Sequence, residues 1–430
     1  MASCESPNGE SAAPQAERRC LEGSSKKKKK SYLLKIGCFK SSSGTTVEIP
    51  DGFHALEMES DVAGERRLPT HLVVFVNGII GSAANWKYAA KQFVKRFPED
   101  VVVHCSECNC SLLTLDGVDV MGDRLAQEIV SVIKRRPELQ KISFVGHSLG
   151  GLIARYAIGR LYGRNPRREP SESNGDHNVN EYEVQCVEEK SEGKIAGLEP
   201  VNFITSATPH LGSRGHKQIP ILHGSRTLEK MASGSSRILR RTGKHLFLKD
   251  KNDGKPPLLL QMVDDCGELK FMSALRSFKR RVAYANACYD RILKKCYNEN
   301  YLTQSKDIVG WKTSSIRRQH ELPKHLLKSK NDKYPHIINV EVPKGDIILE
   351  EFLSESKMNS TVWEEAMIRG LNKVSWERVD VSFRKSKQRL LAHSTIQAIP
   401  SISQKFEVKT YCINSDGADV IFHMIDNFLL

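Results

Sequence analysis

Hydrophobic residues along the chain gather in short continuous runs that are separated by longer polar stretches. An apolar run of four to eight residues, rich in β-branched side chains, is typical of a strand that is covered on both faces. On this basis the run at 71–76 predicts a strand, and shorter or interrupted apolar stretches predict further strands at 101–103, 142–145, 201–205, 281–284, 336–342 and 379–383.

A second pattern has the spacing of helices. Between 120 and 134 the apolar residues Leu125, Ile129 and Ile133 recur every four positions, and Ile153, Ala157 and Leu161 do the same further on. This spacing places them on one face of a helix. Helices are also expected from about Trp86 to Phe93 and over 418–430. Strands that alternate with helices in this way predict a parallel, doubly wound sheet, which binds ligands at the carboxyl edge of its strands.

The strand at 142–145 runs into the sequence Gly146-His147-Ser148-Leu149-Gly150. A serine on a sharp strand-to-helix turn needs neighbours without side chains, and G-x-S-x-G provides them. Such a turn exposes the hydroxyl and lets the N–H of Leu149 stabilise an oxyanion. An ordinary glycine-rich turn has the same letters, so the interpretation of Ser148 as a nucleophile depends on its partners.

A serine nucleophile needs a general base, and the base needs an orienting carboxylate. In this type of sheet the chain order is serine, acid, histidine. Asp290 follows the strand at 281–284 and is the expected acid, with Asp307 as the alternative. His393 follows the last predicted strand and is the expected base. His423 is the alternative, although its place inside the terminal helix favours a packed structural role.

The second oxyanion donor should come from the loop after the strand at 71–76. Ile79, which follows Gly78, is the candidate. Losing one such donor costs about 3 to 4 kcal/mol of transition-state stabilisation. Asn77-Gly78 is also a plain turn, in which Asn77 shapes the loop. We assign five residues to the substrate pocket: Asn77, Gly78, His147, Thr208 and His210.

Four motifs together resemble the family called putative serine esterases, which is related to the yeast ROG-type lipases, with plant members looking most similar. The motifs are Asn77-Gly-Ile-Ile-Gly81 through Trp86, Gly146-His-Ser-Leu-Gly150, Thr208-Pro-His-Leu-Gly212, and Tyr284-Ala-Asn with Asp290. The resemblance covers about 66–430. It implies an α/β-hydrolase fold and hydrolysis of acyl esters, with lipids as the expected substrates. The family's serine falls on Ser148, and its acid and histidine are matched by Asp290 and His393.

Two departures from the family pattern affect this interpretation. Family members usually have His-Gly where Asn77-Gly78 stands, which should be tolerated because the oxyanion hole uses backbone N–H groups. The family also runs directly from the aspartate into Val-Gly-Trp, whereas a stretch at 293–308 intervenes here. A displaced acid would make the chain a non-catalytic lipid-binding or scaffold protein. Acyl transfer to a second alcohol is a third interpretation.

Cysteine usage and hydropathy indicate in which cellular compartment the chain is expected. The chain has 430 residues and 11 cysteines, an odd number that favours free thiols in a reducing, cytoplasmic setting. We find no run long enough to span a membrane and no apolar core of a signal peptide. Cys105, Cys108 and Cys110 look like half of a zinc site, but no second pair stands near them, so neither a metal nor another cofactor is expected.

The net charge of +14 favours anionic partners. No nucleic-acid motif accompanies it, and the aromatic residues, 7% of the chain, do not interleave with the basic runs, so nucleic acid is not expected. Lys26–Lys30 is open to three interpretations: a solvated spacer, a peripheral contact with an anionic membrane, or a localisation signal. The expected substrate is an acyl ester or lipid. The oligomeric state is not assigned.

These patterns divide the chain as follows. We expect a disordered polar tail over 1–30, leading strands or a linker over 31–65, and the α/β-hydrolase domain over 66–430. Within that domain we expect a mobile insertion over 165–199, a lid-like insertion over 215–276 and an insertion after the acid over 293–308.

Overall fold

The computed structural model describes residues 68–167, 192–214, 239–251, 254–288, 290, 310–321, 331–343, 360–399, 401–403, 410–412 and 415–430. All of them belong to one unit, Phe53–Leu430. The predicted segments 1–30, 31–65 and 293–308 lie outside the described residues. So do most of the predicted insertion 165–199 and the part of 215–276 that precedes residue 239, and the roles expected for these segments stay predictions.

The described residues form a seven-stranded sheet with the order β2-β1-β3-β4-β5-β7-β6. Neighbouring strands are parallel, except that β6 runs antiparallel to β7 at one edge. The strands are β1 (His71–Val76), β2 (Val101–Cys105), β3 (Lys141–His147), β4 (Glu199–Ser206), β5 (Arg280–Asn286), β6 (Ile337–Glu341) and β7 (Glu377–Val381). A separate antiparallel pair joins β8 (Ser401–Ser403) to β9 (Thr410–Cys412).

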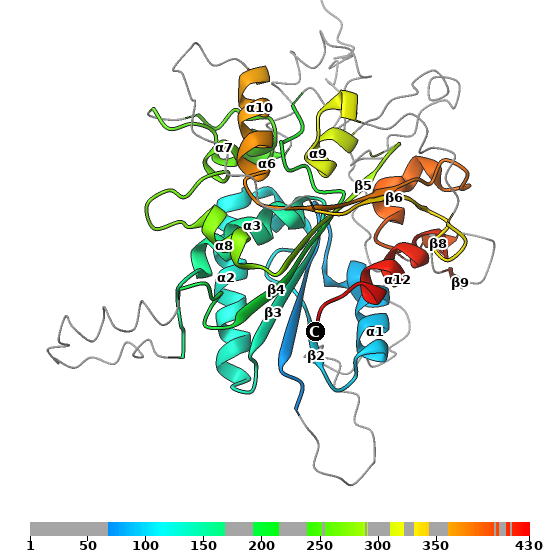
Figure 1. Ribbon diagram of the computed structural model, residues 1–430, viewed down its shortest axis with the longest axis horizontal. Coiled ribbons are helices and arrows are strands. Elements are labelled where there is room, and N and C mark those ends of the chain that lie inside the picture. The colour runs from blue at the N-terminus through cyan, green and yellow to red at the C-terminus, as the bar shows by residue number, and fades with distance from the viewer. Residues whose placement is uncertain are drawn as a thin grey trace, which may run out of the picture. The chain divides into compact units, whose positions relative to one another are not determined.

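Helices cover both faces of the sheet (Figure 1). On one face lie α2 (Val118–Arg135), α3 (Leu149–Leu161) and α8 (Phe271–Ser277), and on the other lie α1 (Lys87–Arg96) and α12 (Ala418–Asp426). Alternate residues of β1 serve the two cores: Leu72 and Val74 pack toward α2 and α3, whereas Val73 and Phe75 pack toward α1 and α12. The predicted fold class, an α/β-hydrolase fold with a doubly wound and mostly parallel sheet, is confirmed.

Further short elements occupy the connections. In Figure 1, α6 (Arg240–Leu246), α7 (Leu258–Gln261), α9 (Trp311–Ser315) and α10 (Ser360–Leu371) lie beyond the carboxyl ends of the strands. Of the segment predicted as lid-like, α6 and α7 lie there, whereas its last helix, α8, packs against α3 on the face of the sheet. The remaining short turns are η1 (Ala83–Trp86), η2 (Ser111–Leu115), η5 (Gln319–Glu321), η7 (Arg389–Leu391), α11 (Ala392–Thr395) and η8 (Ser415–Gly417).

Within the described part of the chain, none of the helices combines the length and the apolar character that crossing a bilayer requires.

Candidate active site

Ser148 is the single residue between β3 and α3. Its φ of 54° and ψ of −125° lie in a region that residues with a side chain rarely adopt, and its N–H donates to Ser206 O at 2.8 Å. The flanking glycines are required by close contacts. A Cβ on Gly146 would lie 2.7 Å from Gly151 Cα, and one on Gly150 would lie 2.3 Å from Val76 O. The backbone therefore holds Ser148 in the strained turn that a nucleophile elbow requires.

Three residues from distant parts of the chain meet at this turn. Ser148 Oγ lies 2.8 Å from His393 Nε2, and His393 Nδ1 lies 2.7 Å from Asp290 Oδ1. Their exposed fractions are 2% for Ser148, 5% for His393 and 0% for Asp290. A carboxylate can only accept, so we assign the hydrogen of His393 to Nδ1, which leaves Nε2 to accept from the serine hydroxyl. This arrangement can transfer a proton from the serine to the imidazole.

Asp290 is contacted by residues on both sides of the segment 293–308, whose presence raised the alternative of a displaced acid. Asn286 Nδ2, at the end of β5, donates to Asp290 Oδ1 at 3.0 Å, and Ser314 Oγ in α9 donates to Asp290 Oδ2 at 3.2 Å. The rival acid Asp307 lies outside the described residues. Sequence reasoning did not single out Asn286 or Ser314, although Asn286 belongs to the motif Tyr284-Ala-Asn and Ser314 lies three residues after Trp311.

His147 supports His393 from the strand side. Its Nε2–H donates to the backbone carbonyl of His393 at 2.6 Å, and the two ring centroids are 4.9 Å apart. Burial, reinforced by the neighbouring His393, lowers the pKa of His147 to about 3. The ring of His147 is therefore neutral near pH 7, and it can fix the backbone of His393 without adding a charge.

His423 lies elsewhere, although it was the rival for the general base. Its Nδ1 is 2.8 Å from the hydroxyl of Tyr284, and its ring packs against that of Tyr334 with the centroids 4.9 Å apart. Burial lowers the pKa of His423. Of the two candidate histidines, the structure brings His393 to Ser148.

The loop after β1 passes close to the serine. A Cβ on Gly78 would stand 2.9 Å from Ser148 Cβ, so only glycine fits without a shift. Asn77 Nδ2 donates to Gly78 O at 3.2 Å and to Asn109 O at 2.9 Å, which holds the loop in shape. The N–H groups of Ile79 and Leu149 have no partner among the described residues. Their role as an oxyanion hole stays a prediction.

Thr208 and His210 follow β4 and are fully buried. His210 Nε2 lies 3.0 Å from Thr205 Oγ1, and its ring packs against Trp376 with the centroids 5.5 Å apart. Burial holds the pKa of His210 well below its ordinary value. Thr208 packs against Gly151, where an added Cβ would lie 2.2 Å from Thr208 Oγ1. These contacts brace the segment after β4 against α3, and a direct contact of either residue with substrate stays a prediction.

Metal ligands were considered at Cys105, Cys108 and Cys110. Burial raises the pKa of the Cys105 and Cys108 thiols to about 12, which favours the neutral thiol over the thiolate that binds zinc. Among the described residues, no group of three or more histidine, cysteine, aspartate or glutamate side chains is placed to hold a metal ion.

Comparisons with known proteins find similarity to serine esterases and lipases. A family model described as "Putative serine esterase (DUF676)" matches residues 66–297. "Putative lipase ROG1" of Saccharomyces cerevisiae is 32% identical over 228 residues, which are 52% of this chain and 27% of that protein. "Putative lipase YDL109C" of the same yeast is 30% identical over 228 residues, again 52% of this chain and 29% of the relative. The match thus spans less than a third of the length of either relative.

Among solved structures, the lipase BlEst2 of Bacillus licheniformis in its propeptide form is similar at 14% identity and a TM-score of 0.29. The similarity covers 53% of this chain and 37% of that one.

Proposed function

Because the chain belongs to the putative serine esterase family, we propose that it is a serine hydrolase that cleaves acyl esters through Ser148, His393 and Asp290. One observation carries the proposal: a buried relay of 2.8 Å and 2.7 Å contacts joins the three side chains at a strained strand-to-helix turn. A serine hydroxyl is a poor nucleophile near neutral pH, and a histidine at this distance is what activates it.

The proposed reaction has two halves. Ser148 Oγ attacks the acyl carbonyl while His393 Nε2 takes its proton, and Asp290 stabilises the imidazolium that forms. The N–H groups of Ile79 and Leu149 stabilise the tetrahedral oxyanion. His393 then returns the proton to the leaving alcohol, which departs and leaves an acyl-serine. Water attacks this ester by the same steps in reverse order and releases the fatty acid.

We propose glycerolipids at a membrane surface as the substrates. The yeast relatives are named lipases, and the surroundings of the candidate oxyanion loop are apolar. Ile80 on that loop is 38% exposed, and Leu112 and Leu113 on η2 are 50% and 43% exposed. The loop and η2 are joined because the N–H of Ile80 donates to Thr114 Oγ1 at 2.8 Å. Exposed apolar side chains on the candidate oxyanion loop and on η2 favour the acyl chains of lipids over polar esters.

The alternative of a non-catalytic scaffold requires a relay that the segment after Asp290 has broken. The contacts of Asp290 with Asn286, Ser314 and His393 argue against it.

The test is hydrolysis of a soluble nitrophenyl ester and of dispersed diacylglycerol. We expect Ser148→Ala and His393→Ala each to lower kcat by at least about 10³-fold. Ser131→Ala on α2, a matched control for the loss of one hydroxyl, should leave it unchanged. Ester hydrolysis that survives Ser148→Ala, or purified wild-type protein that cleaves neither substrate, would contradict the proposal. Cleavage of the soluble ester alone would contradict the lipid assignment.

A further inference from the structure

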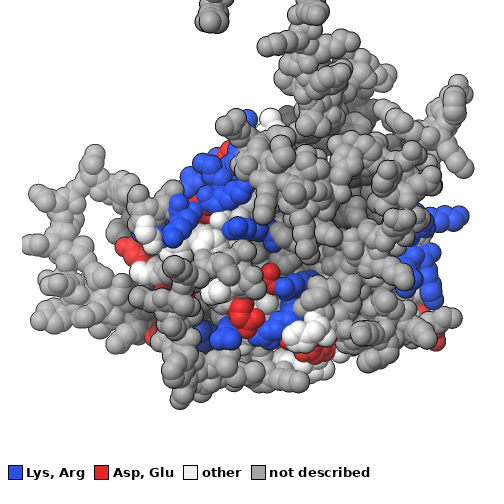
Figure 2. Space-filling model, turned by 90° about the horizontal axis from the view of Figure 1, so that it is seen from above, with Lys and Arg blue, Asp and Glu red and all other residues white. Residues whose placement is uncertain are grey.

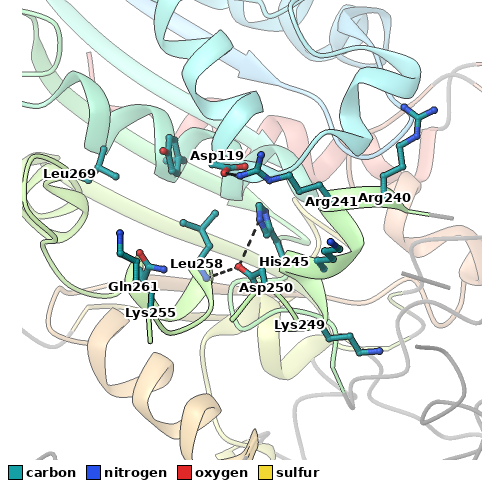
Figure 3. A pocket seen from close by; sticks show the side chains of 12 residues that line it. Asp119, Arg240, Arg241, His245, Lys249, Asp250, Lys255, Leu258, Gln261 and Leu269 are labelled. Carbon is teal, nitrogen blue, oxygen red and sulfur yellow. Dashed lines mark hydrogen bonds and ion pairs between the residues drawn. The ribbon is translucent and has the colours of Figure 1, made fainter. Parts of the chain in front are cut away.

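A cavity with a volume of about 690 Å³ lies apart from the candidate triad, between α6, α7 and the first turn of α2 (Figure 3). None of Ser148, Asp290 and His393 lines it. Its lining is mainly charged and comprises Asp119, Tyr156, Arg240, Arg241, Lys244, His245, Lys249, Asp250, Lys255, Leu258, Gln261 and Leu269. Nothing in the proposed ester hydrolysis uses these residues.

The cavity carries an excess of positive charge. Five cationic side chains and two carboxylates line it, which leaves three positive charges when His245 is neutral. Burial lowers the pKa of His245 and so favours its neutral form. One cation, Arg241, pairs with Asp119, and Figure 3 shows the two side chains turned toward each other. Among the described residues, Arg240, Lys244 and Lys255 have no carboxylate partner and are exposed.

The floor of the cavity is fixed by buried polar contacts. His245 Nδ1 accepts from the N–H of Val118 at 3.0 Å, and Asp250 Oδ2 accepts from the N–H of Leu258 at 2.8 Å. Thr242 Oγ1 donates to Thr114 O at 2.8 Å. The bonds of His245 and Thr242 tie α6 to the start of α2 and to η2, and the bond of Asp250 ties the segment after α6 to α7. Arg240 and Lys244 therefore project from a helix that is held in place, and binding an anion to them would cost little ordering of α6.

The cavity lies near the carboxyl edge of the sheet, where Ser148 follows β3. The N–H of Ser213, in the segment after β4, donates to Leu246 O in α6 at 2.7 Å, so α6 lies over the carboxyl edge of the sheet. Leu112 and Leu113 are exposed on η2, which contacts α6. Seen from above in Figure 2, the described part of this face carries patches of Lys and Arg side chains. Free phosphate would use only the cations, whereas a phospholipid bilayer presents both a phosphate and an apolar layer.

We propose that this basic cavity binds the phosphate group of an anionic phospholipid, with Leu112 and Leu113 entering the same bilayer. Bound in this way, the carboxyl edge of the sheet and Ser148 face the membrane surface. The consequence for catalysis rests on the proposed function, whereas the binding itself does not.

The test compares two charge-matched variants of the full chain, both carrying Ser148→Ala so that turnover plays no part. The cavity variant combines Arg240→Gln, Lys244→Gln, Lys249→Gln and Lys255→Gln. The control combines Lys91→Gln, Lys95→Gln, Lys134→Gln and Arg135→Gln, which are exposed on α1 and α2. Both lose three lysines and one arginine and keep Lys26–Lys30. Binding is measured by co-sedimentation with phosphatidylcholine vesicles that contain phosphatidic acid, and thermal melts verify that both variants fold.

A cation close to an anionic bilayer strengthens binding by roughly fivefold before screening by salt. We therefore expect the cavity variant to bind at least about tenfold more weakly than its parent, and the control to change by less than about threefold. Equal weakening of both variants would mean that net charge alone drives binding and would overturn the proposal, as would a cavity variant that binds like its parent.

Two further measurements separate the sources of phosphate. Leu112→Ser combined with Leu113→Ser should weaken vesicle binding by roughly tenfold if both side chains enter the bilayer. Unchanged binding would contradict the membrane orientation. Inorganic phosphate, titrated by calorimetry, should bind weakly or not at all. If the cavity variant loses phosphate binding but binds vesicles as its parent does, the cavity binds a soluble phosphate, and the lipid proposal is overturned. Wild-type protein, with Ser148 intact, that hydrolyses no ester would refute the proposed function and leave these binding results intact.

Discussion

The contact between His147 and the backbone of His393 gives a sharp test of how the general base is positioned. His147→Phe keeps a ring of similar size beside His393 and Trp86 but removes the N–H that donates to His393 O at 2.6 Å. A buried carbonyl left without its donor costs about 1 to 3 kcal/mol. If the short helix α11, which carries His393, shifts so that this carbonyl regains a partner, the distance from His393 Nε2 to Ser148 Oγ, 2.8 Å in the native arrangement, lengthens.

A cost of that size, expressed at the transition state, corresponds to a fall in kcat of about 10- to 100-fold. Because His147 is 5% exposed and acts through His393, KM for a soluble ester should change little. The alternative, in which His147 lines the substrate pocket, predicts the opposite division: a raised KM with kcat nearly unchanged. Steady-state kinetics on a short-chain nitrophenyl ester separate the two.

His147→Gln is the matched control because its amide N–H can still reach the carbonyl, and it should recover most of the lost kcat. Because the pKa of His147 is about 3, this residue does not titrate between pH 5 and 8. The pH–rate profile of His147→Phe should therefore have the same shape as that of the wild type over this range. A kcat of His147→Phe equal to that of the wild type, or equal losses in the Phe and Gln variants, would refute the positioning argument.

Three further outcomes follow from the structure. Gly78→Ala places a Cβ 2.9 Å from the Cβ of Ser148 and should lower kcat by about 10²- to 10³-fold. A kcat equal to that of the wild type would exclude the close approach. His423→Phe removes the partner of the Tyr284 hydroxyl and should cost about 1 to 3 kcal/mol of unfolding free energy with kcat retained, and a loss of kcat in folded protein would contradict its structural role. Burial lowers the pKa of His71 from 6.5 to about 4. Between these two pH values the unfolded chain therefore binds more protons at this residue than the folded chain does. The free energy of unfolding should fall as the pH drops from 6.5 to 4, by up to about 3 kcal/mol. Urea unfolding of the wild type and of His71→Phe at pH 7 and 4.5 measures this loss of unfolding free energy, which should be smaller in the variant.

The strands of the sheet could be predicted from the sequence because burial on both faces leaves a strong signal. The run 71–76 coincides with β1, and the predicted 142–145 is the centre of β3. The strand beside the β6 edge was displaced by two residues: 379–383 was predicted where β7 spans Glu377–Val381. The antiparallel direction of β6 depends on pairing with β7, and a strand's own sequence does not encode the direction of its neighbour.

The segments between the late strands were harder to interpret. The helix α10 was not predicted, and α6 and α7 were recognised only as part of a loose insertion, because their mixed basic and apolar residues lack a clear helical period. Their position is fixed by contacts with distant residues, such as the bond from Thr242 Oγ1 to Thr114 O, which no local pattern reveals.

For the candidate site, chain order and fold class were enough to bring Ser148, Asp290 and His393 forward as partners. The side chains that hydrogen-bond to these residues and hold them in place could not be predicted. Asn286 and Ser314 lie 28 residues apart in the sequence, yet both bond to the carboxylate of Asp290. His147 was assigned to the substrate pocket from its place in the motif, whereas its bond to the carbonyl of His393 spans 246 residues.

The central claim is that Ser148 is a nucleophile activated by His393. The most direct measurement is the mass-spectrometric location and rate of labelling by a fluorophosphonate probe, which reacts with activated serines. We predict a single adduct on the peptide that contains Ser148, no adduct in Ser148→Ala, and labelling slowed by at least about 10²-fold in His393→Ala. An adduct on another serine, or a labelling rate at Ser148 that does not depend on His393, would contradict it.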